Sequence, residues 1–194
     1  MSELRAWTAA VLFGTLWGTL EVSLGSALHL SRFPLRGLIM SSLGLLCLIT
    51  LSRLSPRVGN SILAGLVAAF IKIFALGGLY PGPLIGILLE ALVVELLLDL
   101  GGVRFLTAMT AGACVLALTP LQMAVTVRLL SGPDAIVGLN EFLGMFLKRV
   151  GLPPVSIGMM LLSAAAVAAI AGVAAGWGSW KISSRVLRRM EGSL

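Results

Sequence analysis

Long apolar runs separated by short polar breaks make up most of this chain. Each run is close to the ~20 mostly apolar residues that a helix needs to cross a hydrocarbon core of ~30 Å. Backbone groups in lipid must bond to one another within a span, so such runs predict helices. We therefore expect an all-α fold, with residues 1–194 forming a single transmembrane domain of about six membrane-spanning helices. The expected spans lie near residues 7–30, 36–52, 60–79, 83–100, 105–130 and 154–179.

Composition supports a membrane location. Of the 194 residues, 58% are hydrophobic and 11% charged, and the mean hydropathy is +1.06. A soluble domain carries about 25% charged residues, because it needs a polar surface. The first apolar run, from Trp7 to Leu30, is longer than the 7–15 residues typical of a signal-peptide core. We therefore expect it to stay in the protein as the first span.

The basic residues predict the orientation, since short cytoplasmic loops are enriched in Lys and Arg. With the N-terminus inside, the cytoplasmic side holds Arg5, Arg53, Arg57, Arg104, Lys181, Arg185, Arg188 and Arg189. The outer side then holds Arg32, Arg36, Lys148 and Arg149, with Arg128 near the boundary. This bias predicts a multi-pass protein of the cell (inner or plasma) membrane with both termini in the cytoplasm. The net charge of +6 is spread over the ends of the runs, which favours the lipid bilayer as a partner and argues against nucleic acid.

The segment 132–153 is the only long break between runs. Apolar residues recur in it at helical spacing, which predicts an amphipathic helix on the outer surface. These residues are Leu139, Phe142, Leu143, Phe146, Leu147 and Val150. The helix is either an interfacial connector or a lid over a site that opens outward.

Ionisable side chains inside a span are costly and usually face the interior of the bundle. Lys72 lies nine residues before Pro81 and Glu90 nine residues after it, so both lie ~13 Å below the same surface. A short connection makes the two helices antiparallel neighbours, and we expect a Lys72–Glu90 ion pair. Glu21 and Gln122 lie at similar depths in their own runs.

Two interpretations of this polar layer stay open. It is either a set of packing contacts or a pocket that binds a substrate from outside. One cation, two anions and an amide suit a zwitterionic or heterocyclic small molecule. His29, at the outer mouth beside Arg32, is a further candidate for the pocket. Glu95 and Asp99 lie on another face, toward the inner side of the bundle or a partner at the cytoplasmic surface.

The sequence offers little for metal or catalytic chemistry. Cys47 and Cys114 each lie alone in an apolar run, without the spacing of a zinc site or a disulfide framework. There is no P-loop motif for ATP hydrolysis, and His29 is the single histidine. We expect no catalytic residues, no metal and no cofactor, and we expect that the chain is not an enzyme.

Small residues four apart line the first run at Ala10, Gly14 and Gly18. Such a stripe lets another helix approach closely, either inside the bundle or on another subunit. The Ala- and Gly-rich stretch from Ala164 through Gly176 permits the same kind of contact in the last run.

The size, the six runs, this stripe and the run from Pro81 to Gly102 resemble the S components of energy-coupling factor (ECF) vitamin transporters. The resemblance implies a subunit that captures a vitamin or similar small molecule outside the cell. It also implies docking through the small residues of the first helix onto a membrane coupling subunit driven by cytoplasmic ATPases. In place of two alanines expected there, this chain has Gly14 and Gly18, and Lys72 is an unusual addition. A membrane scaffold without a ligand, and an intramembrane enzyme, are the alternatives.

Overall fold

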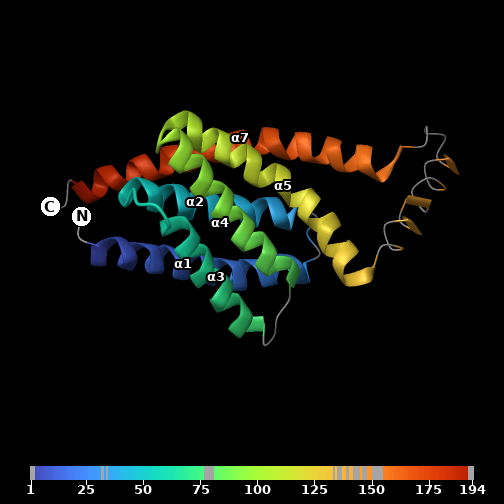
Figure 1. The fold of residues 1–194 in the computed structure, drawn as a ribbon, viewed down its shortest axis with the longest axis horizontal. Coiled ribbons are helices and arrows are strands. Elements are labelled where there is room, and N and C mark those ends of the chain that lie inside the picture. Colours follow the sequence, from blue (N-terminus) through green and yellow to red (C-terminus); the bar gives the residue numbers. More distant parts are fainter. Residues whose placement is uncertain are drawn as a thin grey trace.

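The structure, a computed structural model, describes most of the chain and shows a bundle of helices (Figure 1). It covers residues 3–31, 33, 35–76, 81–132, 134, 137–138, 140–141, 145, 148–149 and 155–191, without the side chains of Leu76, Pro81, Leu130 and Glu191. Its helices are α1 (Glu3–Leu30), α2 (Arg36–Leu54), α3 (Asn60–Leu76), α4 (Pro81–Gly101), α5 (Phe105–Ser131) and α7 (Ile157–Glu191). Since these ranges contain helices and no strand, the predicted all-α fold is confirmed.

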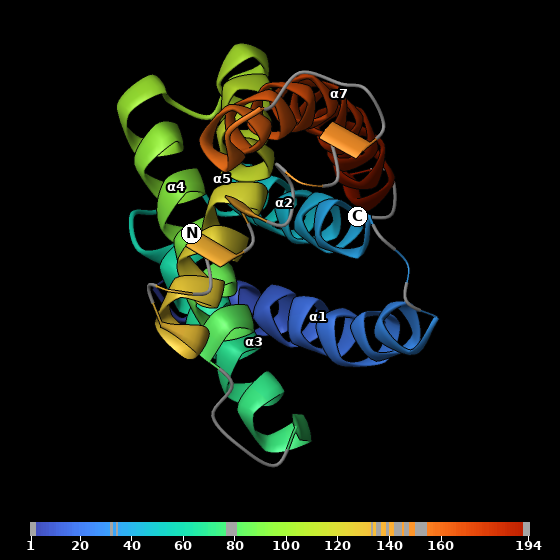
Figure 2. The ribbon, with the colours of Figure 1, turned by 90° about the vertical axis from the view of Figure 1, so that its right-hand side faces the viewer.

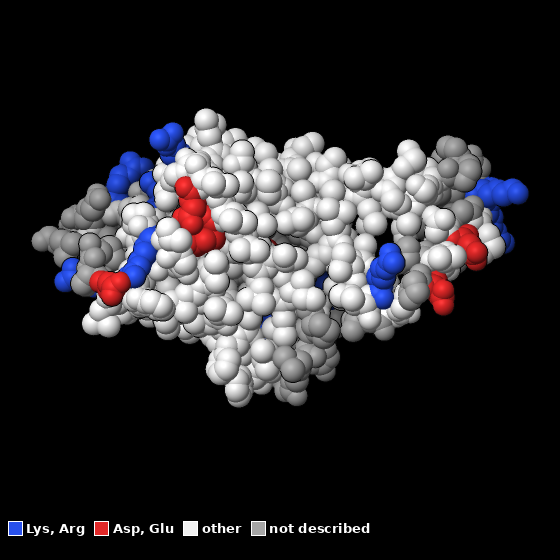
Figure 3. Space-filling view, viewed as in Figure 1, with Lys and Arg blue, Asp and Glu red and all other residues white. Residues whose placement is uncertain are grey.

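Four helices, α1, α2, α5 and α7, are long and apolar enough to cross a membrane. With 17 residues, α3 is shorter than a usual span, and α4 carries Glu90, Glu95 and Asp99. In Figure 3, charged side chains lie toward the two ends of the molecule, and a broad uncharged belt crosses the middle of this face. Length, composition and this belt fit a membrane protein.

Helix α2 is the centre of the bundle, because it contacts each of the other five helices. Leu45, Leu48 and Leu51 on α2 are fully buried. Around it, α1 packs on α3 and α5 packs on α7, with α4 against α3 and α5 (Figure 2). Both ends of the chain lie at the same end of the bundle, which we call the terminal end (Figure 1).

Glycines allow the backbones of α5 and α7 to touch. A Cβ atom added at Gly172 would lie 2.2 Å from the carbonyl oxygen of Gly112, and one at Gly176 would lie 2.3 Å from that of Ala108. The close approach expected from the Ala- and Gly-rich last run is therefore present, and its partner is α5.

The small-residue stripe of α1 faces α3. A Cβ atom at Gly14 would lie 2.6 Å from the Ala64 carbonyl oxygen, and one at Gly18 would lie 3.0 Å from the Ala68 Cα atom. Ala10 of the same stripe has 0% exposure. Of the two uses expected for the stripe, the structure shows the contact inside the bundle. In this conformation the stripe is not exposed for docking onto another subunit.

The segment 132–153 falls largely outside the described residues. All six apolar positions of the predicted amphipathic helix are among the residues that the structure does not describe, so that prediction and the proposed lid stay untested. Asn140, a described residue of this segment, contacts the last helix: its side-chain oxygen accepts a hydrogen bond of 3.0 Å from the backbone N–H of Ile157, at the start of α7.

Candidate functional site

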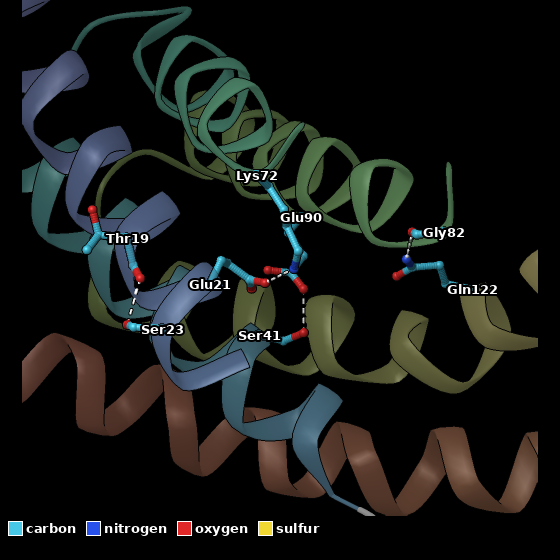
Figure 4. Close-up of polar contacts among 8 residues, drawn as sticks. All are labelled: Thr19, Glu21, Ser23, Ser41, Lys72, Gly82, Glu90 and Gln122. Carbon is cyan, nitrogen blue, oxygen red and sulfur yellow. Dashed lines mark hydrogen bonds and ion pairs between the residues drawn. The ribbon is translucent and has the colours of Figure 1, made fainter. Parts of the chain in front are cut away.

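Three charged residues from three helices meet inside the bundle (Figure 4). Lys72 of α3 donates a hydrogen bond to the Oε2 atom of Glu21 on α1, and the two side chains are only 12% and 8% exposed. Glu90 of α4 lies beside them. On its other side, the Glu90 Oε1 atom accepts a hydrogen bond from the hydroxyl of Ser41 on α2. We call Glu21, Ser41, Lys72 and Glu90 the buried cluster.

The sequence predicts an ion pair between Lys72 and Glu90, but Lys72 pairs with Glu21 instead. The helix contacts explain this difference. On α1, Glu21 continues the stripe of Gly14 and Gly18 that faces α3. On α3, Lys72 is four residues beyond Ala68, which faces that stripe. Residues three or four apart share a helix face, so the close α1–α3 packing points the two side chains at each other. Counting residues from a turn gives the depth of a residue but not its direction around the helix.

One oxygen of the buried cluster has no hydrogen-bond partner among the residues that the structure describes. The Glu90 Oε2 atom is buried and makes no hydrogen bond to any described residue. The indole N–H of Trp17, also buried, is unpartnered in the same sense. Both atoms lie against Gly44: a Cβ atom added there would be 2.8 Å from Trp17 Nε1 and 2.9 Å from Glu90 Oε2. An unsatisfied acceptor and an unsatisfied donor thus lie against the same glycine of α2.

The charges of the cluster do not balance when all its groups are ionised. Two carboxylates, Glu21 and Glu90, accompany one ammonium group, Lys72, and no other Lys or Arg in the described part of the chain pairs with either carboxylate. An unpaired charge in a low-dielectric interior costs several kcal/mol. A proton on one of the two carboxyl groups would balance the charge, and so would a ligand that brings a positive charge or a good hydrogen-bond donor to Glu90.

Two predicted site residues lie outside the buried cluster. The Gln122 side-chain amide donates a hydrogen bond of 2.8 Å to the Gly82 carbonyl oxygen, at the start of α4 (Figure 4). His29 is exposed at the end of α1 and contacts the guanidinium group of Arg36. The structure thus brings three of the five predicted residues together.

Sequence reasoning missed Ser41, Trp17 and Gly44 as neighbours of Glu90. Ser41 was a detectable signal, because a hydroxyl in a long apolar run needs a hydrogen-bond partner. Trp17 and Gly44 gave no such signal, since both residue types are common in apolar spans. Their position follows from the packing of α1 on α2.

Glu95 serves a separate, structural contact. Its carboxylate accepts hydrogen bonds from the backbone N–H groups of Gly59 and, at 2.8 Å, Ser61, at the start of α3. A carboxylate is favourable at a helix N-terminus, where N–H groups lack partners inside the helix. Asp99, one turn further along α4, is exposed. Glu95 therefore holds α3 to α4 and does not belong to the buried cluster.

The last observations on the site concern metal binding and similarity to known proteins. Among the described residues, no group of three His, Cys, Asp or Glu side chains is placed to hold a metal ion. Comparison of the chain with protein-family models, with curated proteins and with solved structures finds no match. The functional argument therefore depends on the geometry of the buried cluster.

Proposed function

We propose that this chain is the substrate-capturing subunit of a membrane uptake transporter, and that it binds a small water-soluble molecule at the buried cluster. In this proposal it crosses the cell membrane six times, with both termini in the cytoplasm. The observation that carries the proposal is the buried Oε2 atom of Glu90, which has no hydrogen-bond partner in the described part of the chain.

A cluster that only specifies packing should satisfy its own polar atoms. About 90% or more of buried polar groups in proteins have a hydrogen-bond partner. Leaving one unsatisfied costs about 1–3 kcal/mol, and more for a charged group. A ligand with an N–H group or a positive charge would satisfy the Glu90 oxygen and offset the surplus negative charge. This favours an amine, a zwitterion or an N–H-bearing heterocycle.

The cluster is closed in this conformation, since Glu21 has only 7% exposure. Binding and release then require the helices around it to move. Because the sequence contains no P-loop, the energy for transport would come from a partner or from a gradient. The resemblance to ECF S components favours a membrane coupling subunit with cytoplasmic ATPases. Ala10, Gly14 and Gly18 are buried in this conformation, so docking through them would require α1 and α3 to separate.

A scaffold protein without a ligand is the second candidate. The bonded Lys72–Glu21 pair favours it, because that part of the cluster is satisfied within the chain. An intramembrane enzyme is the least favoured, since the single histidine, His29, is exposed and contacts Arg36.

Native mass spectrometry of the purified protein separates these candidates. We expect a retained small molecule on the wild type, and we expect Glu90→Gln to lose it, because an amide carries no charge to pair with the ligand. Asp99→Asn is the matched control, since it removes an exposed acid from the same helix and should keep the molecule. No retained molecule on the wild type would favour the scaffold. Equal retention in all three proteins would show that the molecule does not bind at Glu90 and would contradict the proposed site.

A further inference from the structure

An apolar groove opens at the terminal end, between the first turns of α1 and the last turns of α7. Its volume is about 500 Å³, and it is lined by apolar side chains together with Arg5 and Thr8. The apolar side chains that line it are Leu4, Ala9, Leu12, Phe13, Leu54, Val186 and Met190. Leu54 belongs to the end of α2, so the groove has walls from α1 and α7 and a floor from α2.

The packing of the bundle explains why the groove stays open. Helix α1 is held against α3 by Gly14 and Gly18, and α7 is held against α5 by Gly172 and Gly176. These two contacts lie on different sides of α2, which touches both α1 and α7 (Figure 2). Within the described residues, α1 and α7 do not pack on each other.

One arginine lines the groove and two directly precede lining residues in the sequence; we call these three arginines its basic rim. Arg5 lines the groove, and Arg185 and Arg189 directly precede Val186 and Met190 on α7. The three arginines are exposed and have no acidic partner among the described residues. Glu3, the nearest acid along α1, is paired with Arg57 at 2.5 Å. The rim is therefore positive and suited to an anion.

We propose that this groove binds one anionic phospholipid, with an acyl chain along the groove and the phosphate at Arg5. Apolar walls below a cationic rim match the two parts of such a lipid. Size also favours a lipid over a partner helix. One turn of a helix 10–12 Å across and 5.4 Å long occupies about 400–600 Å³, so the groove would hold barely one turn. From Leu4 to Leu12 the wall is ~12 Å long, enough for part of an extended chain. The proposal is independent of the ligand at Glu90.

The test uses the full chain in detergent with equal amounts of phosphatidylglycerol and phosphatidylcholine of the same acyl chains. Native mass spectrometry then counts the lipids retained. We expect the wild type to retain phosphatidylglycerol preferentially. Arg5→Gln should lower that preference about fivefold, the effect of about 1 kcal/mol for one basic residue near an anionic lipid. Arg104→Gln is the control, because it removes an exposed charge from the same end outside the groove and should change nothing.

A second variant tests the groove itself. Thr8→Trp places a large side chain in the groove and should lower the retention of both lipids, while the melting temperature and elution volume report that the protein is folded. Equal retention of the two lipids by the wild type would overturn the proposal, and so would equal effects of Arg5→Gln and Arg104→Gln. A dimer that Thr8→Trp dissociates, with lipid retention unchanged, would also overturn it and mark the groove as a protein interface.

Discussion

The ammonium group of Lys72 lies close to two carboxylates and donates a hydrogen bond to one of them. Its ammonium group donates to Glu21, while Glu90 takes its hydrogen bond from Ser41. In a low-dielectric interior the ammonium group still attracts the second carboxylate, because charges interact there over longer distances than in water. Lys72 therefore neutralises part of the charge on both.

This sharing predicts different costs for removing different members of the cluster. Lys72→Met leaves two buried carboxylates without a cation and should lower the free energy of unfolding by about 3–5 kcal/mol. Glu21→Gln leaves Lys72 and Glu90, whose charges balance, and should cost less. Thermal unfolding of the two variants in the same detergent measures the difference. Equal losses would mean that Lys72 does not act on Glu90.

At this scale the sequence predicts burial better than it predicts partners. The placement of Glu21, Lys72 and Glu90 inside apolar runs is enough to expect them in the bundle interior. Whether Lys72 bonds to Glu21 or to Glu90 depends on the rotation of α1 against α3. The stripe of small residues determines that rotation. The contact of Gln122 with the Gly82 carbonyl depends on the packing of α5 against α4 in the same way.

Helix pairs in this protein are held together through small residues, and the α5–α7 contact is the closest example. The Gly112 carbonyl oxygen lies so close to the Gly172 backbone that a side chain at Gly172 would collide with it. Without a hydrophobic driving force between helices in lipid, close van der Waals packing of this kind is a main source of association.

Two glycines of α7 give a matched test of this contact. Gly172→Ala places a Cβ atom 2.2 Å from a backbone oxygen, so the helices must separate, and we expect a loss of about 1–3 kcal/mol or more. Gly178→Ala has open space around the new Cβ atom and should be neutral or stabilising by about 0.5–1 kcal/mol, because alanine favours helix. Melting temperatures of the two variants report the difference, and similar values would contradict the packing account.

Helix existence follows from the apolar runs, and helix ends follow less well. The last run was expected to end near 179, but α7 continues to Glu191. The last turns of α7 are basic, so their sequence does not predict a membrane span. They nevertheless remain helical and contact α2. The Arg53 guanidinium group stacks 3.8 Å from the Trp180 ring and donates to the Ser183 hydroxyl at 2.6 Å. A single-sequence pattern does not contain this contact between distant residues.

The whole molecule combines an apolar exterior with a polar site at its centre. On the face shown in Figure 3 the surface is uncharged across the middle, while the charges of the buried cluster lie inside the bundle. Both chain ends and the groove between α1 and α7 lie at the terminal end (Figure 1). The apolar face fits a membrane protein, and the proposal that the buried cluster binds a polar molecule is tested by the measurement below.

The most direct test of the central claim is thermal unfolding of the ligand-free protein with and without added ligand. The material to add is the small-molecule fraction released when the purified protein is denatured. A ligand at 100 times its Kd that binds only the folded state stabilises it by about 2.7 kcal/mol. We predict a higher melting temperature for the wild type and for Asp99→Asn, and no change for Glu90→Gln. No change for the wild type, or the same rise for Glu90→Gln, would contradict the proposal that Glu90 binds a substrate.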